Sequence, residues 1–215
     1  VREFAFEIVE YLINEHDVKL LVVACNTAAA AALDELSAET SVPIIGVIAP
    51  GAQAAIDVSR TGQIGVIGTV GTINSGAYTR AFSTLSGGEI RPMTLACPGF
   101  VEFVEKGEAS GEQLQVLAER LLAPIVSANV DTLLLGCTHY PYLARVIGQV
   151  VGSDVVLVSS ADETAFEVSR QLTEMDLLLK DEKEGKRVFI SSGDVSWFAE
   201  VGERLFGPEL ASAKP

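Results

Sequence analysis

The feature that most constrains this chain is an apolar run that ends in a cysteine motif and occurs twice. The two copies read LLVVACNT at residues 20–27 and TLLLGCTH at residues 132–139. Apolar runs without polar alternation are typical of strands that are buried on both faces of a parallel sheet. The loop at the carboxyl end of such a strand is where open α/β sheets bind ligands. Each half of the chain therefore presents one thiol, Cys25 or Cys137, at a corresponding position.

The rest of the chain alternates between expected strands and helices. Strands are predicted at residues 18–24, 42–47, 63–68, 93–96, 131–136, 154–158 and 187–190. Helices are predicted at residues 2–15, 28–38, 50–59, 100–106, 112–128, 141–150, 161–179 and 194–206, with one more ending near residue 87. Residues 69–75 are expected to form a loop, and residues 181–186 a charged surface loop. This alternation predicts an α/β fold with largely parallel sheets.

Composition excludes several classes of protein. A length of 215 residues allows one large domain or two small ones, and a hydrophobic content of 48% indicates a globular chain. No apolar run reaches the roughly 18 residues of a membrane span. A net charge of −14 disfavours nucleic acid and anionic membranes as partners. Three cysteines without a CxxC pair suggest neither a disulfide framework nor a zinc site, so a reducing cytoplasm fits best.

Two thiols in corresponding loops suit one kind of acid–base chemistry. Removing a proton from a carbon next to a carboxylate needs a well-placed base and a site that stabilises the developing charge. Inverting that carbon also needs an acid that delivers a proton to the opposite face. A thiol, with an ordinary pKa of about 8.5, can perform either task if its surroundings tune it. We therefore interpret Cys25 and Cys137 as a candidate acid–base pair.

Neither cysteine loop contains a lysine or an arginine. Asn26, Thr27 and Thr138, with the backbone N–H groups that open the following helices, can hold a carboxylate instead. His139 can tune the Cys137 thiol or share its proton.

Other residues have simpler interpretations. A single cysteine in an apolar setting is more often a core residue than a reactive one, and Cys97, which has no duplicate, is expected to be structural. His16 is expected at the exposed end of a helix. Thr69 and Thr72 can serve simply as caps of the next helix. The glycines around them match neither the GxGxxG nor the GxxxxGK[ST] pattern, so no nucleotide-binding loop is predicted.

At this point the residues resemble a known family. Ala-Cys-Asn-Thr at 24–27 and Gly-Cys-Thr-His-Tyr-Pro at 136–141 resemble the two signature motifs of glutamate racemases, in the cofactor-independent aspartate/glutamate racemase superfamily. The resemblance continues in order along essentially the whole chain. It includes a threonine-rich segment at 65–78, a segment at 97–105 that carries a glutamate, and a Ser-Gly-Asp turn at 192–194.

The resemblance implies a fold and a division into domains. Members consist of two similar α/β domains with mainly parallel sheets, which are related by a pseudo-twofold axis and hold the active site in the cleft between them. Carried over to this chain, residues 1–47 plus 160–215 would form the first domain, and residues 48–159 the second.

The resemblance also implies roles for individual residues. Cys25 and Cys137 would be the catalytic acid–base groups on the two faces of the substrate Cα, and His139 and Glu105 would assist them. The expected substrate-binding residues are Asn26, Thr27, Thr69, Thr72, Thr138 and His139. The reaction would interconvert L- and D-glutamate without pyridoxal phosphate, another cofactor or a metal. D-Glutamate would feed peptidoglycan synthesis in a bacterial cytoplasm, and the protein would form a homodimer, as many members do.

The chain departs from the family pattern at its start. Members begin with a strand that ends in an Asp-Ser-Gly motif, followed by a segment with a Tyr-Gly pair, and both help to bind substrate. No Asp-Ser-Gly occurs here, and the chain begins with Val1 inside a predicted helix. We therefore expect an N-terminally truncated chain with an uncovered sheet edge and weak or no activity.

Three other functions remain open at the level of sequence. One is a racemase for aspartate or another amino acid, or a related decarboxylase or isomerase. A second is a non-catalytic binding or regulatory module in which both cysteines are core residues. The third is a cysteine hydrolase, which gives the second cysteine no role because it needs only one nucleophile beside a histidine.

Overall fold

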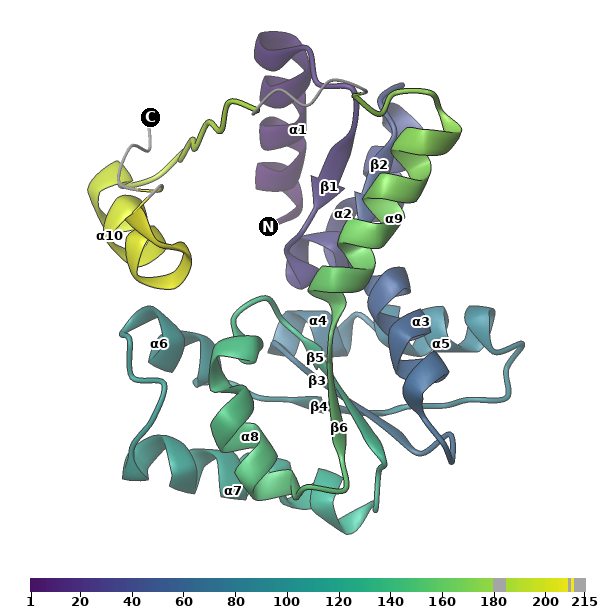
Figure 1. The fold of residues 1–215 in the computed structure, drawn as a ribbon, viewed down its shortest axis with the longest axis vertical. Coiled ribbons are helices and arrows are strands. Elements are labelled where there is room, and N and C mark those ends of the chain that lie inside the picture. Colours follow the sequence, from purple (N-terminus) through teal and green to yellow (C-terminus); the bar gives the residue numbers. More distant parts are fainter. Residues whose placement is uncertain (180–184, 209, 211–215) are drawn as a thin grey trace. The chain divides into compact units, whose positions relative to one another are not determined.

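The computed structural model describes residues 1–179, 185–208 and 210, and these divide into two compact units. The larger unit comprises residues 1–104 and 108–178, and the smaller one comprises residues 105–107 and the chain from residue 179 onward. Figure 1 shows both units, and every strand β1 to β6 belongs to the larger one. None of the helices in the described part of the chain is long and apolar enough to cross a membrane.

A four-stranded parallel sheet, in the order β4-β3-β5-β6, is the centre of the larger unit. Its strands are β3 (Ile64–Gly68), β4 (Met93–Ala96), β5 (Thr132–Gly136) and β6 (Val156–Ser159). All five residues of β3 and all five of β5 are buried, as expected for central strands that have both faces covered. The register pairs Gly68 with Gly136, so these two strands end at the same level.

Helices cover this sheet because its strands direct alternate side chains to opposite faces. Val66 and Leu134 belong to one core cluster with Ala52 of α3 (Ile48–Val58) and Phe82 of α5 (Ala77–Leu85). The remaining helices that follow β3, β4 and β5 are α4 (Val70–Asn74), α6 (Phe100–Glu105), α7 (Glu112–Ser127), the 3₁₀ helix η1 (Tyr140–Leu143) and α8 (Ala144–Val151). The buried side chains of α7 repeat at helical spacing, as in a helix with one face turned to the core.

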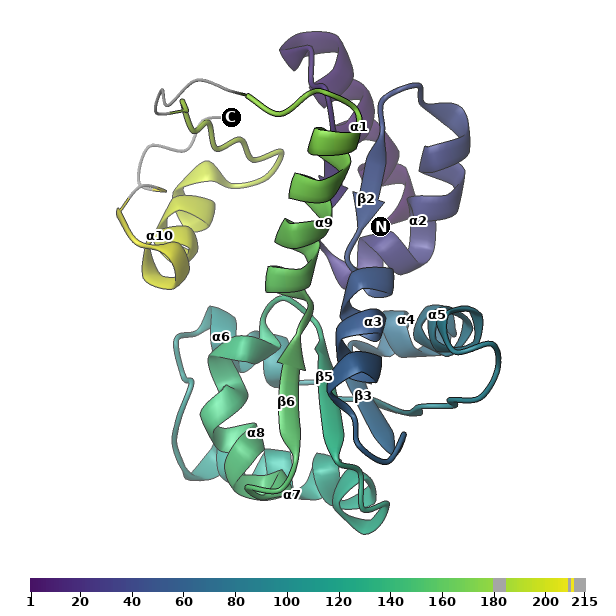
Figure 2. The same cartoon turned by 45° about the vertical axis from the view of Figure 1, so that its right-hand side comes forward.

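A second, two-stranded parallel sheet pairs β1 (Leu21–Val23) with β2 (Ile44–Gly46). It packs with α2 (Asn26–Glu39), an alanine-rich helix of high intrinsic helix propensity. α1 (Arg2–His16) contacts α2, and Arg2 forms an ion pair with Glu35 there. α9 (Ser160–Glu174) runs beside β2, as both Figure 1 and Figure 2 show.

The α/β class and the parallel sheets are thus confirmed, whereas two local predictions are wrong. Residues 69–75 do not form an open loop, because Val70–Asn74 is the short helix α4. Thr69 caps this helix, since its Oγ1 accepts a hydrogen bond from the Thr72 N–H at 3.3 Å. The predicted strand at residues 187–190 is reduced to an isolated bridge at Ile190, and a strand is stable only when a neighbouring strand supplies a ladder of hydrogen bonds.

Boundaries differ at further places, among them the end of α9, which lies at Glu174 instead of residue 179. α2 and α3 each begin two residues earlier than predicted, at Asn26 and Ile48. The helix expected at 141–150 is divided into η1 and α8. In the smaller unit, α10 (Val195–Phe206) begins one residue after its predicted start and is capped by the Asp194 side chain, which accepts from the Trp197 N–H. Of the charged loop predicted at 181–186, residues 181–184 lie outside the described part of the chain.

Candidate active site

The candidate residues follow the carboxyl ends of parallel strands, where ligands bind in α/β sheets. Cys137 comes directly after β5, and Thr69 comes directly after the neighbouring strand β3. Cys25 lies two residues after β1 and is the N-cap residue of α2. The first hydrogen bond within α2 joins the Ala29 N–H to the Cys25 carbonyl, so the backbone N–H groups of Asn26, Thr27 and Ala28 have no acceptor within the helix.

Three threonine hydroxyls meet between α2 and α4. The Oγ1 atom of Thr27 lies 2.9 Å from that of Thr69 and 3.1 Å from that of Thr72. The remaining pair, Thr69 and Thr72, is 3.0 Å apart. Thr72 is fully buried, whereas Thr27 and Thr69 are half-buried. We refer to these three side chains as the threonine cluster, and it brings together three predicted substrate-binding residues from two distant parts of the sequence.

Asn26, next to Cys25, is held by a residue of α5. The Tyr78 hydroxyl donates a hydrogen bond to Asn26 Oδ1 at 2.5 Å, and both side chains are buried. The other end of this amide is different: no residue in the described structure bonds to Asn26 Nδ2, although this nitrogen is also buried. A buried donor without an acceptor is rare in native proteins and marks a place where a ligand can bind.

The same tyrosine also touches the second cysteine motif. A Cβ atom added to Gly136, the residue before Cys137, would lie 2.7 Å from Tyr78 Cε2. Burial, followed by the charge of Cys137, raises the pKa of the Tyr78 hydroxyl, which therefore keeps its proton. Tyr78 thus connects the Cys25 motif with the Cys137 motif. In the sequence, Tyr78 was only the last residue of the threonine-rich segment at 65–78 and had no role of its own.

The three cysteines differ in their surroundings. Cys25 is exposed, while Cys137 is only 7% exposed and its Sγ lies 3.9 Å from His139 Nδ1. Cys97 is buried, and this burial raises the pKa of its thiol to about 12. A thiol with such a high pKa stays protonated, which agrees with the prediction that Cys97 is structural.

Not every predicted site residue is placed beside the others. Thr138 is exposed at the surface of the Cys137 loop. Glu105 belongs to the smaller unit, where its backbone carbonyl accepts a hydrogen bond from Arg204 Nη1 at 2.7 Å. Its predicted role in assisting catalysis therefore remains a prediction. No group of three or more His, Cys, Asp or Glu side chains among the described residues is arranged to hold a metal ion.

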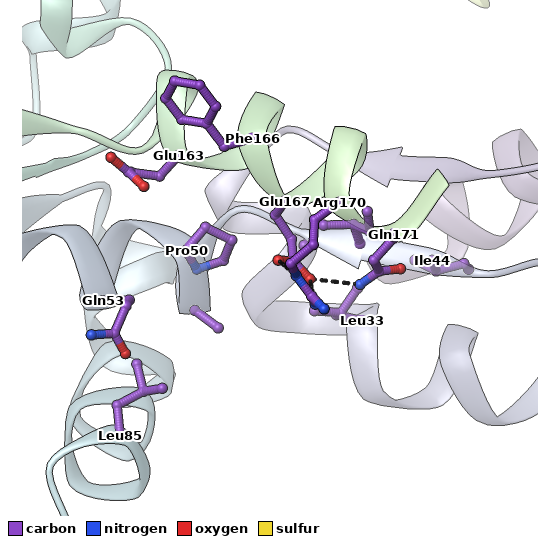
Figure 3. A pocket seen from close by; sticks show the side chains of 13 residues that line it. Leu33, Ile44, Pro50, Gln53, Leu85, Glu163, Phe166, Glu167, Arg170 and Gln171 are labelled. Atoms are coloured by element: carbon purple, nitrogen blue, oxygen red, sulfur yellow. Dashed lines mark hydrogen bonds and ion pairs between the residues drawn. The ribbon is translucent and has the colours of Figure 1, made fainter. Parts of the chain in front are cut away.

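A separate pocket of about 600 Å³ lies between β2, α3 and α9 (Figure 3). Pro50 and Phe166 supply apolar walls, and Glu167 accepts hydrogen bonds from Arg170 and Gln171. None of the residues that line it belongs to the predicted active site.

Comparison with known proteins identifies the family. Residues 3–167 match the Asp/Glu/Hydantoin racemase family. The whole chain is 44% identical to a glutamate racemase of Corynebacterium diphtheriae and covers 80% of it. The crystal structure of glutamate racemase isoform RacE1 from Bacillus anthracis superimposes with a TM-score of 0.89 at 43% identity, over 96% of this chain and 76% of that one. A glutamate racemase from Francisella tularensis, solved with D-glutamate, gives a TM-score of 0.85 at 30% identity, over 94% and 74% of the two chains.

The fold is therefore that of an amino-acid racemase. The chain belongs to the Asp/Glu/Hydantoin racemase family, and its similarity to the glutamate racemases within that family confirms the resemblance found in the sequence.

Proposed function

We propose that this chain interconverts L- and D-glutamate by moving a proton at Cα between the thiols of Cys25 and Cys137. Similarity to proteins named glutamate racemase, over at least 96% of this chain, supports the reaction and its substrate. The structural observation that carries the proposal is the contact of Tyr78 with both cysteine motifs, through Asn26 on one side and Gly136 on the other.

The proton balance of the reaction requires two groups in opposite states. One cysteine, as the thiolate, takes the α-proton and becomes a thiol, and the electron pair left on Cα delocalises into the substrate carboxylate. The other cysteine, as the thiol, then donates its proton to the opposite face of Cα and becomes a thiolate. The reverse reaction exchanges these roles. His139 Nδ1 lies 3.9 Å from Cys137 Sγ, so the imidazole is placed to exchange a proton with that thiol.

The substrate carboxylates would be held by neutral donors. Asn26 and Thr27 directly follow Cys25 at the start of α2, and the Thr27 hydroxyl lies within hydrogen-bond distance of the Thr69 and Thr72 hydroxyls. Helix N-termini favour anions because the backbone N–H groups carry partial positive charge there. We assign Asn26, Thr27, Thr69 and Thr72 to this binding site, and Thr138 and His139 to its Cys137 side.

The cellular role that we propose is the supply of D-glutamate for peptidoglycan synthesis, which places the reaction in the bacterial cytoplasm. We also propose that the protein acts as a homodimer of two-domain chains. The domain division inferred from the sequence puts residues 1–47 plus 160–215 in one domain and residues 48–159 in the other.

Proton NMR in deuterium oxide tests the reaction and the substrate together. L-Glutamate and D-glutamate are incubated separately with the chain, and L- and D-aspartate serve as controls. We expect loss of the α-proton signal from both glutamate enantiomers, formation of the opposite enantiomer, and no change in aspartate. Exchange in aspartate but not in glutamate would favour a racemase of different substrate specificity, and no exchange with any of the four would contradict racemisation by this chain.

A further inference from the structure

The amide of Asn26 is bonded at only one of its two ends. Its Oδ1 accepts from the Tyr78 hydroxyl at 2.5 Å, while its Nδ2 is buried and has no partner among the described residues. An asparagine side chain can rotate by half a turn and exchange the positions of these two atoms, because the torsion next to the amide has a broad, roughly two-fold profile. The group that holds one end of the amide therefore decides whether the donor Nδ2 or the acceptor Oδ1 faces the substrate.

We propose that Tyr78 is a positioning residue that fixes the Asn26 amide so that only Nδ2, a donor, faces the substrate carboxylate. This inference rests on the proposed function, because it assumes that Asn26 binds the substrate. Without the hydroxyl of Tyr78, the amide is free to turn its Oδ1 toward the carboxylate, where two acceptors would repel each other.

The surroundings of Tyr78 suit a fixed donor. The side chain is 1% exposed, so water does not compete for its hydroxyl. Burial and the nearby Cys137 raise its pKa, so the proton that it donates to Oδ1 is retained near neutral pH. The ring is held against Gly136, which fixes the hydroxyl from the side of the Cys137 loop. Gly136, beside Cys137, thus fixes the position of Tyr78, and Tyr78 in turn sets the orientation of the Asn26 amide beside Cys25.

The experiment compares wild type with Tyr78→Phe, which removes the hydroxyl and keeps the ring against Gly136. KM and kcat are measured in both directions, and the Kd of D-glutamate is measured by calorimetry. We expect KM and Kd to rise roughly threefold to tenfold, the effect of losing one hydrogen bond to the substrate, while kcat changes less than about twofold. Unchanged KM and Kd would overturn the proposal, because a residue that only fills the core would alter the melting temperature and not substrate affinity.

Tyr140→Phe is the matched control. Tyr140 is also fully buried, and its hydroxyl donates to the Cys97 carbonyl at 3.0 Å rather than to Asn26. It should lose a comparable amount of thermal stability with an unchanged Kd. An equal rise in Kd for both variants would mean that any buried hydroxyl in this region affects binding, and it would contradict a specific role for Tyr78.

Two further variants test whether Tyr78 acts through Asn26. If it does, the double variant Asn26→Ala/Tyr78→Phe should have the same Kd as Asn26→Ala alone. A Kd raised by the product of the two single-variant effects would refute the coupling. Asn26→Asp keeps the acceptor for Tyr78 but replaces Nδ2 by an oxygen, so we expect a larger rise in Kd than for Asn26→Ala. An equal or smaller rise would overturn the proposal even if Tyr78→Phe failed to fold.

The wild-type protein separates this inference from the proposed function. Binding of D-glutamate without turnover would refute racemisation by this chain, and the Kd values of the variants would still decide the role of Tyr78. Wild type that neither binds nor converts glutamate would refute both.

Discussion

The hydroxyl oxygens of Thr27 and Thr69 lie 2.9 Å apart. Thr27 lies in the first turn of α2, which follows β1 of the two-stranded sheet, whereas Thr69 follows β3 of the four-stranded sheet. The carboxyl ends of β1 and β3, strands of separate sheets, are thus directed at one shared place. A ligand bound there contacts loops from both sheets.

Thr27→Val should weaken substrate binding while leaving the fold intact. Valine keeps the shape of the side chain but removes the hydroxyl, and Thr69 and Thr72 still bond to each other at 3.0 Å. We expect KM for glutamate to rise roughly threefold to tenfold, with a nearly unchanged melting temperature. Thr173→Val, which removes an exposed hydroxyl bonded to the Ser169 carbonyl in α9, is the control and should leave KM unchanged. A Thr27→Val enzyme with the wild-type KM would contradict a role for the threonine cluster in binding.

Cys25→Ala and Cys137→Ala should each reduce racemisation by at least about 10²-fold, because each removes one of the two groups that transfer the proton. The appearance of the opposite enantiomer, followed by circular dichroism, measures this loss. Cys97→Ala is the matched control, since it also deletes a thiol but one that stays protonated in the core. It should destabilise the protein by roughly 1 kcal/mol and keep the activity of the folded enzyme. Normal racemisation by either of the first two variants would rule out the two-cysteine mechanism.

Asp131→Asn should destabilise the larger unit. The Asp131 carboxylate accepts five hydrogen bonds at 2.7–2.9 Å, which tie the turn before β3 to the start of β5; their donors are Ser59 Oγ, the N–H groups of Arg60 and Thr61, Thr61 Oγ1 and Thr132 Oγ1. We expect a loss of about 2 kcal/mol in the free energy of unfolding at pH 7, measured by urea titration. Asp57→Asn, which affects one exposed hydrogen bond from Gln53, should cost much less.

The stabilisation by Asp131 should also depend on pH. Partial burial alone would raise the pKa of this carboxyl, but the hydrogen bonds from Ser59, Thr61 and Thr132 outweigh it and hold the pKa well below its ordinary value. The folded protein therefore binds the proton more weakly than the unfolded chain, whose pKa is about 3.9. The contribution is complete above roughly pH 4 and is lost as the pH falls below that value. The stability difference between wild type and Asp131→Asn should shrink between pH 7 and about pH 3, and a constant difference would contradict this linkage.

Gly136→Ala should lower stability because the space for a side chain is already filled. The added Cβ would lie 2.7 Å from Tyr78 Cε2 and 2.8 Å from the backbone carbonyl oxygen of Ile67, and the backbone atom cannot move without disturbing the sheet. We expect a loss of roughly 1–3 kcal/mol, which differential scanning calorimetry detects as a lower melting temperature. Gly148→Ala in α8, where the nearest atom is at 3.7 Å, should have the opposite sign because alanine favours the helix. Equal stabilities of the two variants would argue against the close packing of Tyr78 on Gly136.

Several features of the molecule could be predicted from local sequence. β3 and β5 come from runs without polar alternation, and such runs predict strands that are buried on both faces of a sheet. Both strands are indeed fully buried. The positions of Cys25 and Cys137 followed from the strands before them, because a residue after a parallel strand lies at the edge where ligands bind. Resemblance to a family then supplied the chemistry, which periodicity alone left open.

Other features depended on partners that are distant in the sequence. The helix α4 was missed because the glycine and threonine residues before Tyr78 suggest a loop, and only the cap formed by Thr69 completes the turn. The segment that ends at Ile190 has the composition of a strand, but only an isolated bridge forms there. For α4 a hydrogen bond between neighbouring residues contributed to the outcome, and composition does not reveal hydrogen-bond partners.

The sequence by itself determined the α/β class, the order of the central elements and the two thiols, because each depends on hydrophobic patterns within a few residues. Only the tertiary structure decided that Thr27 meets Thr69, that Asn26 bonds to Tyr78, and that Tyr78 touches both cysteine motifs. These contacts join residues that are more than 40 positions apart in the chain. The contacts of Thr27 and Asn26 exist because the carboxyl ends of strands from two separate sheets converge, an arrangement that packing of the whole chain creates.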